Sequence, residues 1–358
     1  MPASVKVNPS APMLVIIVLA VMVALYSVDK FLAAQEKSEL DQEASSNFAA
    51  GQKLLKEGKP HRAITNFARA HAIDRNNREY LLSLGSAQLT DGQLSAAGAT
   101  LGEALDDDSN DGRANLLMAR LMAADGRFKD ADSYYHRAIY GAWQPNRSNP
   151  AEKARLELAN MLAEHGDNQK LLSELLLLQN EPAQDVATKK QIAALFLGAG
   201  SAALAADAYR QLSREDRDDA DIFVGLGQAE ILAGNYPLAE NAFLNALRRR
   251  LNDLHIQSRL EMVARLATLD PTLRRLSSAE KYRRSGAILD LVQDELNACL
   301  PYAKPAVPEK KTGSPISNEM AEARLDRAEK LWKQRNEACK QLPSPGDPLP
   351  LLMKKLSQ

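Results

Sequence analysis

The stretch Gly51-Gln-Lys-Leu-Leu-Lys-Glu-Gly58 decides the fold, because its pattern returns along the chain. Gly85-Ser-Ala-Gln-Leu-Thr-Asp-Gly92 is the second copy, and Ala119-Arg-Leu-Met-Ala-Ala-Asp-Gly126 is the third. Each copy begins on a small residue and ends on a glycine, and the three closing glycines lie 34 residues apart. A period of this length and regularity predicts a solenoid of stacked units.

The residues that follow each glycine stay in the same register. A small residue comes five positions later, a bulkier one at nine and another small one at twelve. These triplets are Ala63, Phe67 and Ala70; Ala97, Leu101 and Ala104; Ala131, Tyr135 and Ala138. We expect a helical hairpin per unit, in which the glycine takes a positive φ, the small residues let the helices approach closely and the bulky residue fills the gap between hairpins.

About six such units are expected over residues 44–253. The register slips by about six residues at 141–150, where two prolines, a glycine and two asparagines predict an extended loop. The fourth unit is degenerate, because leucines replace its small second-helix positions. The sixth unit is the most regular, with Phe223-Val-Gly-Leu-Gly227, then Gly234-Asn-Tyr-Pro-Leu-Ala239, then Phe243 and Ala246.

This pattern resembles the tetratricopeptide repeat (TPR) family. The resemblance implies an all-α superhelix that binds a protein or peptide partner in a concave groove lined by the first helices. Mapped by register, the groove residues are Arg113, Leu116, Arg120, Lys153, Leu156, Asn160, Lys190 and Gln228. This set is mildly basic with apolar patches, which favours an extended or helical peptide carrying some negative charge. Phe48 and Gln52 stand where chaperone-binding members hold a carboxylate clamp, so binding of a chaperone tail is not expected.

Before the repeats, an apolar run follows a short tail at residues 1–11. The run Met13-Leu-Val-Ile-Ile-Val-Leu-Ala-Val-Met-Val-Ala-Leu25 has no charge and predicts a single transmembrane anchor at 12–35, followed by a stalk at 36–43. The alternative is a cleaved signal peptide, although no clear cleavage site follows the run. The basic residues on the two flanks are nearly equal in number, so orientation rests on the cysteines, which favour the bulk domain outside the cytoplasm, on the periplasmic side.

After the repeats, three further segments are expected. Residues 254–300 are helical by pattern and are placed to cap the solenoid, with a helix start at Asp270-Pro271. Residues 301–316 form a proline-rich linker. Residues 317–358 hold a last helix at about 319–341 and a short tail; the apolar stripe of that helix is Met320, Ala323, Leu331 and Trp332.

Cys299 and Cys339 are the only cysteines. They lie near the ends of two predicted helices, and an oxidising compartment would allow a disulfide that clips the last helix to the cap. The alternative is two unrelated free thiols in a cytoplasmic protein. The even count favours the bridge without deciding it.

Composition and motifs argue against several other functions. The net charge of −1 gives no support to nucleic-acid binding. The acidic run at 106–112 resembles a calcium loop but has Met118 where the last ligand should stand, so it predicts a turn. No phosphate loop, nucleophile motif or paired acid set occurs, and we expect neither metal, cofactor nor enzymatic activity. The sequence therefore predicts a membrane-anchored protein-interaction scaffold. The alternatives are a client-specific assembly factor for cell-envelope, secretion or cytochrome-type biogenesis machinery and, more remotely, an enzyme with a site between repeats.

Overall fold

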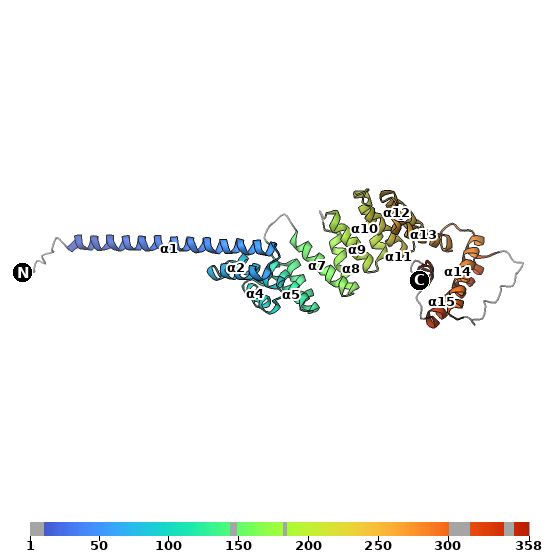
Figure 1. The fold of residues 1–358 in the computed structure, drawn as a ribbon, viewed down its shortest axis with the longest axis horizontal. Helices are drawn as coiled ribbons and strands as arrows, with labels where there is room; N and C mark the ends of the chain where they lie inside the picture. Colours follow the sequence, from blue (N-terminus) through green and yellow to red (C-terminus); the bar gives the residue numbers. More distant parts are fainter. Residues whose placement is uncertain (1–10, 144–148, 182–184, 301–315, 340–346, 358) are drawn as a thin grey trace, which may run out of the picture. The chain divides into compact units, whose positions relative to one another are not determined.

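The computed structural model describes the chain except for residues 1–10, 144–148, 182–184, 301–315, 340–346 and 358; the side chains of 11–18 and 20 also lie outside it. The described residues form sixteen α-helices and one isolated parallel bridge between Asp111 and Ala142. Two compact units are present, residues 1–158 and 159–358, and the boundary falls within one helix, α7. The all-α architecture predicted from the repeat is confirmed (Figure 1).

The first unit holds six complete helices and part of a seventh. They are α1 (Ala11–Lys56), α2 (Pro60–Ile73), α3 (Arg78–Thr90), α4 (Leu94–Asp107), α5 (Gly112–Ala124), α6 (Phe128–Tyr140) and the start of α7 (Pro150–Glu164). From α1 to α6, each helix packs on the next, and α3 also packs on α5. The first helices of successive hairpins therefore lie beside one another, as a stacked helical repeat requires.

The second unit continues the hairpins and then departs from them. Its helices are α8 (Asn168–Gln179), α9 (Val186–Gly198), α10 (Ala202–Glu215), α11 (Ala220–Leu232), α12 (Tyr236–Arg249), α13 (Leu254–Leu269), α14 (Ser278–Cys299), α15 (Asn318–Ala338) and α16 (Leu349–Leu356). Packing runs in chain order from α8 to α15, and α9 also contacts α11.

Six glycines bend the chain between the two helices of a hairpin. Gly58, Gly92, Gly126, Gly166, Gly200 and Gly234 all have φ between 70° and 78°. This left-handed conformation is costly for a residue with a Cβ, which explains why glycine recurs at this position. The predicted role of these glycines is confirmed.

The small residue at the start of each copy has an equally direct explanation. A Cβ added at Gly51 would lie 2.7 Å from the ring of Phe67, and one at Gly85 would lie 2.8 Å from Leu101. In each case the glycine lies on the first helix of a hairpin and the bulky residue lies on the second helix of the same hairpin. Both bulky residues, Phe67 and Leu101, are fully buried. The close approach expected at the small positions is therefore confirmed, and the bulky residue meets the small residue of its own hairpin as well as facing the gap between hairpins.

The predicted membrane anchor corresponds to the beginning of α1, a continuous helix of 46 residues. Over the described residues, none of the helices has the length and hydropathy that a membrane span needs. The transmembrane helix expected at 12–35 is thus not found there, and part of its side chains lies outside the described residues. Between Val21 and Leu32, every residue of α1 is exposed.

Beyond the repeats, the helix start expected at Asp270-Pro271 is wrong. Asp270 ends α13, and α14 begins eight residues later behind Ser277, whose hydroxyl accepts a hydrogen bond from the amide of Glu280. The Asp270 carboxylate does not cap a helix; it accepts hydrogen bonds from the amide and hydroxyl of Thr272, at 2.8 and 2.7 Å.

Helices α14 and α15 pack together and run in the same direction. Arg324 donates to the carbonyl of Tyr282, and Arg335 donates to Glu295 at 3.3 Å, so the paired positions keep nearly the same sequence offset. In an antiparallel pair the offset would change along the helices. The apolar stripe predicted for α15 is confirmed in part: Leu331 and Trp332 are half-buried and pack against a hydrophobic cluster, and Met320 is half-buried, but Ala323 is exposed. The buried residues of α15 are Ala321, Ala328 and Arg335.

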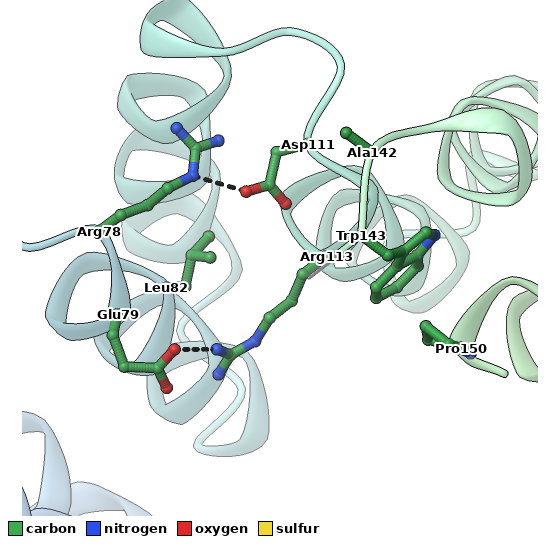
Figure 2. A pocket seen from close by; sticks show the side chains of 8 residues that line it. All are labelled: Arg78, Glu79, Leu82, Asp111, Arg113, Ala142, Trp143 and Pro150. Atoms are coloured by element: carbon green, nitrogen blue, oxygen red, sulfur yellow. Dashed lines mark hydrogen bonds and ion pairs between the residues drawn. The ribbon is translucent and has the colours of Figure 1, made fainter. Parts of the chain in front are cut away.

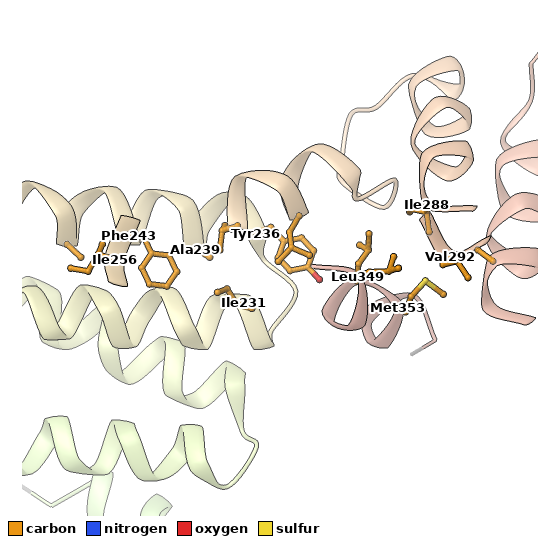
Figure 3. Close-up of a cluster of buried hydrophobic side chains, with 14 of the residues drawn as sticks. Ile231, Tyr236, Ala239, Phe243, Ile256, Ile288, Val292, Leu349 and Met353 are labelled. Carbon is orange, nitrogen blue, oxygen red and sulfur yellow. The ribbon is translucent and has the colours of Figure 1, made fainter. Parts of the chain in front are cut away.

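The expected C-terminal tail contains a docked helix, α16. Leu349, Leu352 and Met353 are buried in a hydrophobic cluster that also includes Tyr236 and Val292 (Figure 3). The Lys355 ammonium donates to the carbonyl of Gly234 at 2.8 Å and to the buried carboxylate of Asp270 at 2.5 Å. Helix α16 therefore connects the last hairpin to α14 and covers the apolar end of that hairpin.

Candidate functional site

Two neighbouring cavities lie on the face that the first helices of the first unit present. One has a volume of about 330 Å³ and lies between α3, α5 and the α6–α7 connection; it is lined by Arg78, Glu79, Leu82, Asp111, Arg113, Ala142, Trp143 and Pro150 (Figure 2). We call it the Trp143 cavity. The other, about 400 Å³, is lined by Gln52, Leu55, Lys56, Phe67, Glu79, Ser83, Ser86 and Arg113. We call it the Ser86 cavity.

Glu79 and Arg113 line both cavities and form an ion pair with each other. Glu79 is on α3 and Arg113 is at the same position one repeat later, on α5. The Glu79 carboxylate also accepts a hydrogen bond from the hydroxyl of Ser83 at 3.2 Å. Both charged side chains are nearly half exposed, so solvent screens the pair and its contribution to stability is small.

The predicted groove cation Arg120 is differently placed. Its guanidinium donates two hydrogen bonds to Glu157, at 2.8 and 2.6 Å, in a bidentate pair between α5 and α7. These hydrogen bonds raise the pKa of Arg120 above its usual value. Arg120 is therefore engaged in joining two repeats. Lys153, by contrast, is exposed and makes no ion pair with any of the described residues.

Two predicted apolar groove residues are less accessible than the register implied. Leu116 is only 8% exposed and belongs to the core of the first unit. Leu156 is half-buried. Of the eight predicted groove residues, Arg113 alone lines the two cavities described above.

In the second unit, the predicted residues also have partners from neighbouring helices. Lys190 pairs with Asp219 at 2.5 Å. Burial raises the pKa of Asp219, but hydrogen bonds from Lys190 and from backbone amides outweigh it, so the net shift is downward. Asn160 accepts a hydrogen bond from Gln191 at 3.0 Å, and Gln228 is half-buried.

Trp143 is a site residue that the sequence reasoning missed. It lies shortly after α6, and its neighbour Ala142 is held against the α4–α5 turn by two backbone hydrogen bonds: the Gly112 amide donates to Ala142 at 2.8 Å, and the Ala142 amide donates to Asn110 at 2.7 Å. The Trp143 indole lies so close to Gly112 that a Cβ there would come within 2.4 Å of the ring. Its N–H donates to the carbonyl of Ala138 at 2.8 Å. The sequence signal for this site residue was the position of a tryptophan at the point where the repeat register slips.

The acidic run at 106–112 forms the turn between α4 and α5. Asp111 caps α5 by accepting a hydrogen bond from the amide of Ala114 at 2.7 Å, and it pairs with Arg78 at 2.5 Å. These bonds use the Asp111 oxygens to connect successive repeats.

At the other end of the chain, the structure joins Cys299 and Cys339 in a disulfide, with their Cα atoms 5.8 Å apart. This separation falls within the ordinary range for a disulfide. The bond links the C-terminal ends of the parallel helices α14 and α15.

One family model matches part of the first unit. Residues 54–121 match the model of the tetratricopeptide repeat family. The matched stretch contains the turn glycines Gly58 and Gly92, as well as Glu79 and Arg113. No match was found among curated proteins.

Several solved structures are similar to this chain at low sequence identity. YrrB, described as a TPR protein with an unusual peptide-binding site, is 15% identical, with a TM-score of 0.42 over 53% of this chain and 95% of that one. PilF of Pseudomonas aeruginosa is 14% identical, with a TM-score of 0.44 over 61% of this chain and 97% of its own. PilW, described as a widely conserved type IV pilus biogenesis factor, is 15% identical, with a TM-score of 0.43 over 60% and 97% of the two chains.

Proposed function

We propose that this protein is a protein-interaction scaffold that binds an extended segment of a partner protein on the first-helix face of its first unit. The observation that carries the proposal is the pair of adjacent cavities that share Glu79 and Arg113. Each cavity has apolar and polar lining residues, and this combination is typical of sites that position a ligand by a few polar contacts. The role is one of binding rather than catalysis.

The test is photo-crosslinking in cells. A photoreactive amino acid replaces Ser86, which lines the second cavity, and crosslinked partners are identified with and without the double substitution Arg113→Glu and Lys153→Glu. The reversed charges are expected to remove the crosslinked species. Arg120 is left intact, because its guanidinium is already held by Glu157 in a bidentate pair that joins two repeats.

The matched control is Lys129→Glu. Lys129 is an exposed cation on α6, a second helix of its hairpin, and it makes no ion pair with any of the described residues. Crosslinks should persist in this variant. Crosslinks that are unchanged by the double reversal, or lost equally in the control, would remove the first-helix face as the binding surface. Co-purification of one stoichiometric client would favour an assembly factor over a general scaffold.

We also propose that residues 12–35 attach the protein to a membrane as a single span, with the bulk domain outside the cytoplasm. The support is the uncharged apolar run of the sequence and the full exposure of its described apolar side chains, such as Leu25 at 65% and Phe31 at 68%. A disulfide between Cys299 and Cys339 fits an oxidising compartment. Extraction at alkaline pH tests attachment, and a C-terminal alkaline phosphatase fusion tests orientation; release into the soluble fraction or an inactive fusion would contradict the respective part.

A further inference from the structure

The Trp143 cavity differs from the rest of the first-helix face because Ala142 and Trp143, which follow α6, form one of its walls. Pro150, at the start of α7, also lines it (Figure 2). The indole lies against Gly112, and the hydrogen bond from the indole N–H to the carbonyl of Ala138 orients the ring. Contacts within the chain therefore hold this apolar wall in place.

The charged side chains at this cavity differ in how many of their hydrogen-bonding groups already have partners. The guanidinium of Arg78 is occupied by Asp111 and by the carbonyls of Ala104 and Asp108. Arg113 uses one N–H, toward Glu79, and makes no other hydrogen bond with any of the described residues. A guanidinium has five N–H donors, so most of the donors of Arg113 are open to a ligand.

On the acidic side, each of the four carboxylate oxygens already has a partner within the chain. The Glu79 carboxylate is engaged by Arg113 and Ser83, and Asp111 is engaged by Arg78 and by the amide of Ala114. A cationic ligand would have to share an oxygen with one of these partners. A carboxylate ligand can take a bidentate position on Arg113 without displacing any.

We propose that the Trp143 cavity is an anchor pocket for a large apolar side chain of a partner peptide, and that an aspartate or glutamate close to that residue binds Arg113. The cavity volume of about 330 Å³ accommodates such a side chain, and the indole wall supplies the flat contact that an aromatic or long aliphatic group prefers. This inference rests on the proposed scaffold function, because it names the chemistry of the segment that the same face binds.

The test uses a phage-displayed library of random linear peptides, panned against the full-length protein. Enriched peptides are expected to share a large apolar residue within a few positions of an acid. Synthetic versions should bind roughly tenfold or more weakly to Trp143→Ala and to Arg113→Gln, as expected for the loss of a central contact. Lys129→Glu should bind as well as the wild type.

A second variant separates the wall from the fold of the loop. Trp143→Phe loses the indole N–H but keeps an aromatic wall, so it should retain most of the affinity that Trp143→Ala loses. The chain has two tryptophans, so Trp332→Phe leaves Trp143 as the sole indole fluorophore, and its emission should shift when peptide binds.

Peptides without the apolar-acidic pairing, equal affinity for Trp143→Ala and the wild type, or an unchanged Trp143 emission would each overturn the inference. A failure of the proposed scaffold function would give a different result from a failure of the anchor pocket. Partners that crosslink at Ser86 but bind Trp143→Ala normally leave the scaffold intact and remove only the anchor pocket. Selected peptides that occupy the pocket, together with no cellular crosslink at Ser86, contradict the scaffold instead.

Discussion

The same substitution, glycine to alanine, should change stability in opposite directions at three positions of one repeat. Gly92 closes the α3–α4 turn at φ 77°, with open space where a Cβ would be. Gly85 lies in α3 against Leu101, and Gly98 lies in α4 with no neighbouring atom near its Cβ position. The three sites therefore isolate backbone strain, side-chain overlap and helix propensity.

The magnitudes follow from these environments. At Gly92, the left-handed conformation costs an alanine about 1–2 kcal/mol. The reduced entropy of the unfolded chain returns about 0.4–1 kcal/mol, so we expect a net loss of about 1 kcal/mol. At Gly98, alanine is the better helix former and should stabilise by about 0.5–1 kcal/mol.

At Gly85, two effects oppose each other. The gain in helix propensity is about 1 kcal/mol, as at Gly98. The new Cβ, however, would lie 2.8 Å from Leu101, a side chain that is fully buried and has no room to move. Overpacking of this kind costs about 1–3 kcal/mol, so we expect a net loss of about 1 kcal/mol.

The assay is urea unfolding followed by circular dichroism, together with hydrogen exchange of the α3 and α4 amides, because a repeat array can open locally. Gly92→Asn is the matched control, since asparagine tolerates the left-handed region and should lose less than alanine. A stabilised Gly92→Ala or a destabilised Gly98→Ala would refute the assignment of these glycines to turn and helix.

Three further predictions concern charges and the disulfide. Removing either Arg120 or Glu157 should lower the free energy of unfolding by about 0.5–1 kcal/mol, and removing both should cost little more, as a double-mutant cycle measures. Hydrogen bonds from two arginines lower the pKa of Glu280 from 4.5 to about 2, so its stabilising effect should be full above pH 4.5 and disappear as the pH falls toward 2; thermal melts of Glu280→Gln and the wild type should differ at pH 7 and converge at pH 2. Replacing Cys299 and Cys339 by serine opens a loop with a sequence separation of 40, which should cost up to about 4 kcal/mol, seen as faster hydrogen exchange in α14 and α15.

The repeat could be predicted from the sequence because its causes are local. A turn glycine needs a positive φ wherever the hairpin is placed, and a small residue such as Gly85 needs only its own hairpin partner, Leu101. Both requirements recur at a fixed spacing, so periodicity alone reveals them. The same spacing also predicts which residues lie on the first-helix face.

The charge state of that face could not be predicted. Arg113 and Arg120 are both predicted groove cations on α5, yet Arg113 donates a single hydrogen bond to Glu79, whereas Arg120 is held by Glu157 in a bidentate pair. The difference depends on which acid a neighbouring repeat brings within reach, and the register slip between α6 and α7 changes the position of Glu157. The insertion also hides the role of Trp143, whose partners belong to the preceding turn.

The C-terminal region was misread for a related reason. The sequence predicted a thin apolar stripe on α15, of which Leu331 and Trp332 do pack against the hydrophobic cluster. The fully buried residues are instead Ala321, Ala328 and Arg335, which recur every seven positions along the face toward α14. Small residues at this spacing allow close helix contact, and Arg335 finds Glu295 across the interface. Burial of α16 depends on Tyr236 and Asp270, which lie far away in the sequence.

The parallel direction of α14 and α15 explains why the repeat pattern stops there. An antiparallel hairpin leaves its second helix pointing back toward the start of the next one, so hairpins can follow each other indefinitely. A parallel pair does not, because α15 begins beside the start of α14, about 30 Å from the end of that helix. Helix α16 then fills the apolar end of the last hairpin, where another repeat would otherwise pack. Deleting residues 347–358 should therefore expose Tyr236 and its neighbours, and increased binding of a hydrophobic dye would reveal that surface; unchanged dye binding would show that α16 does not cover it in solution.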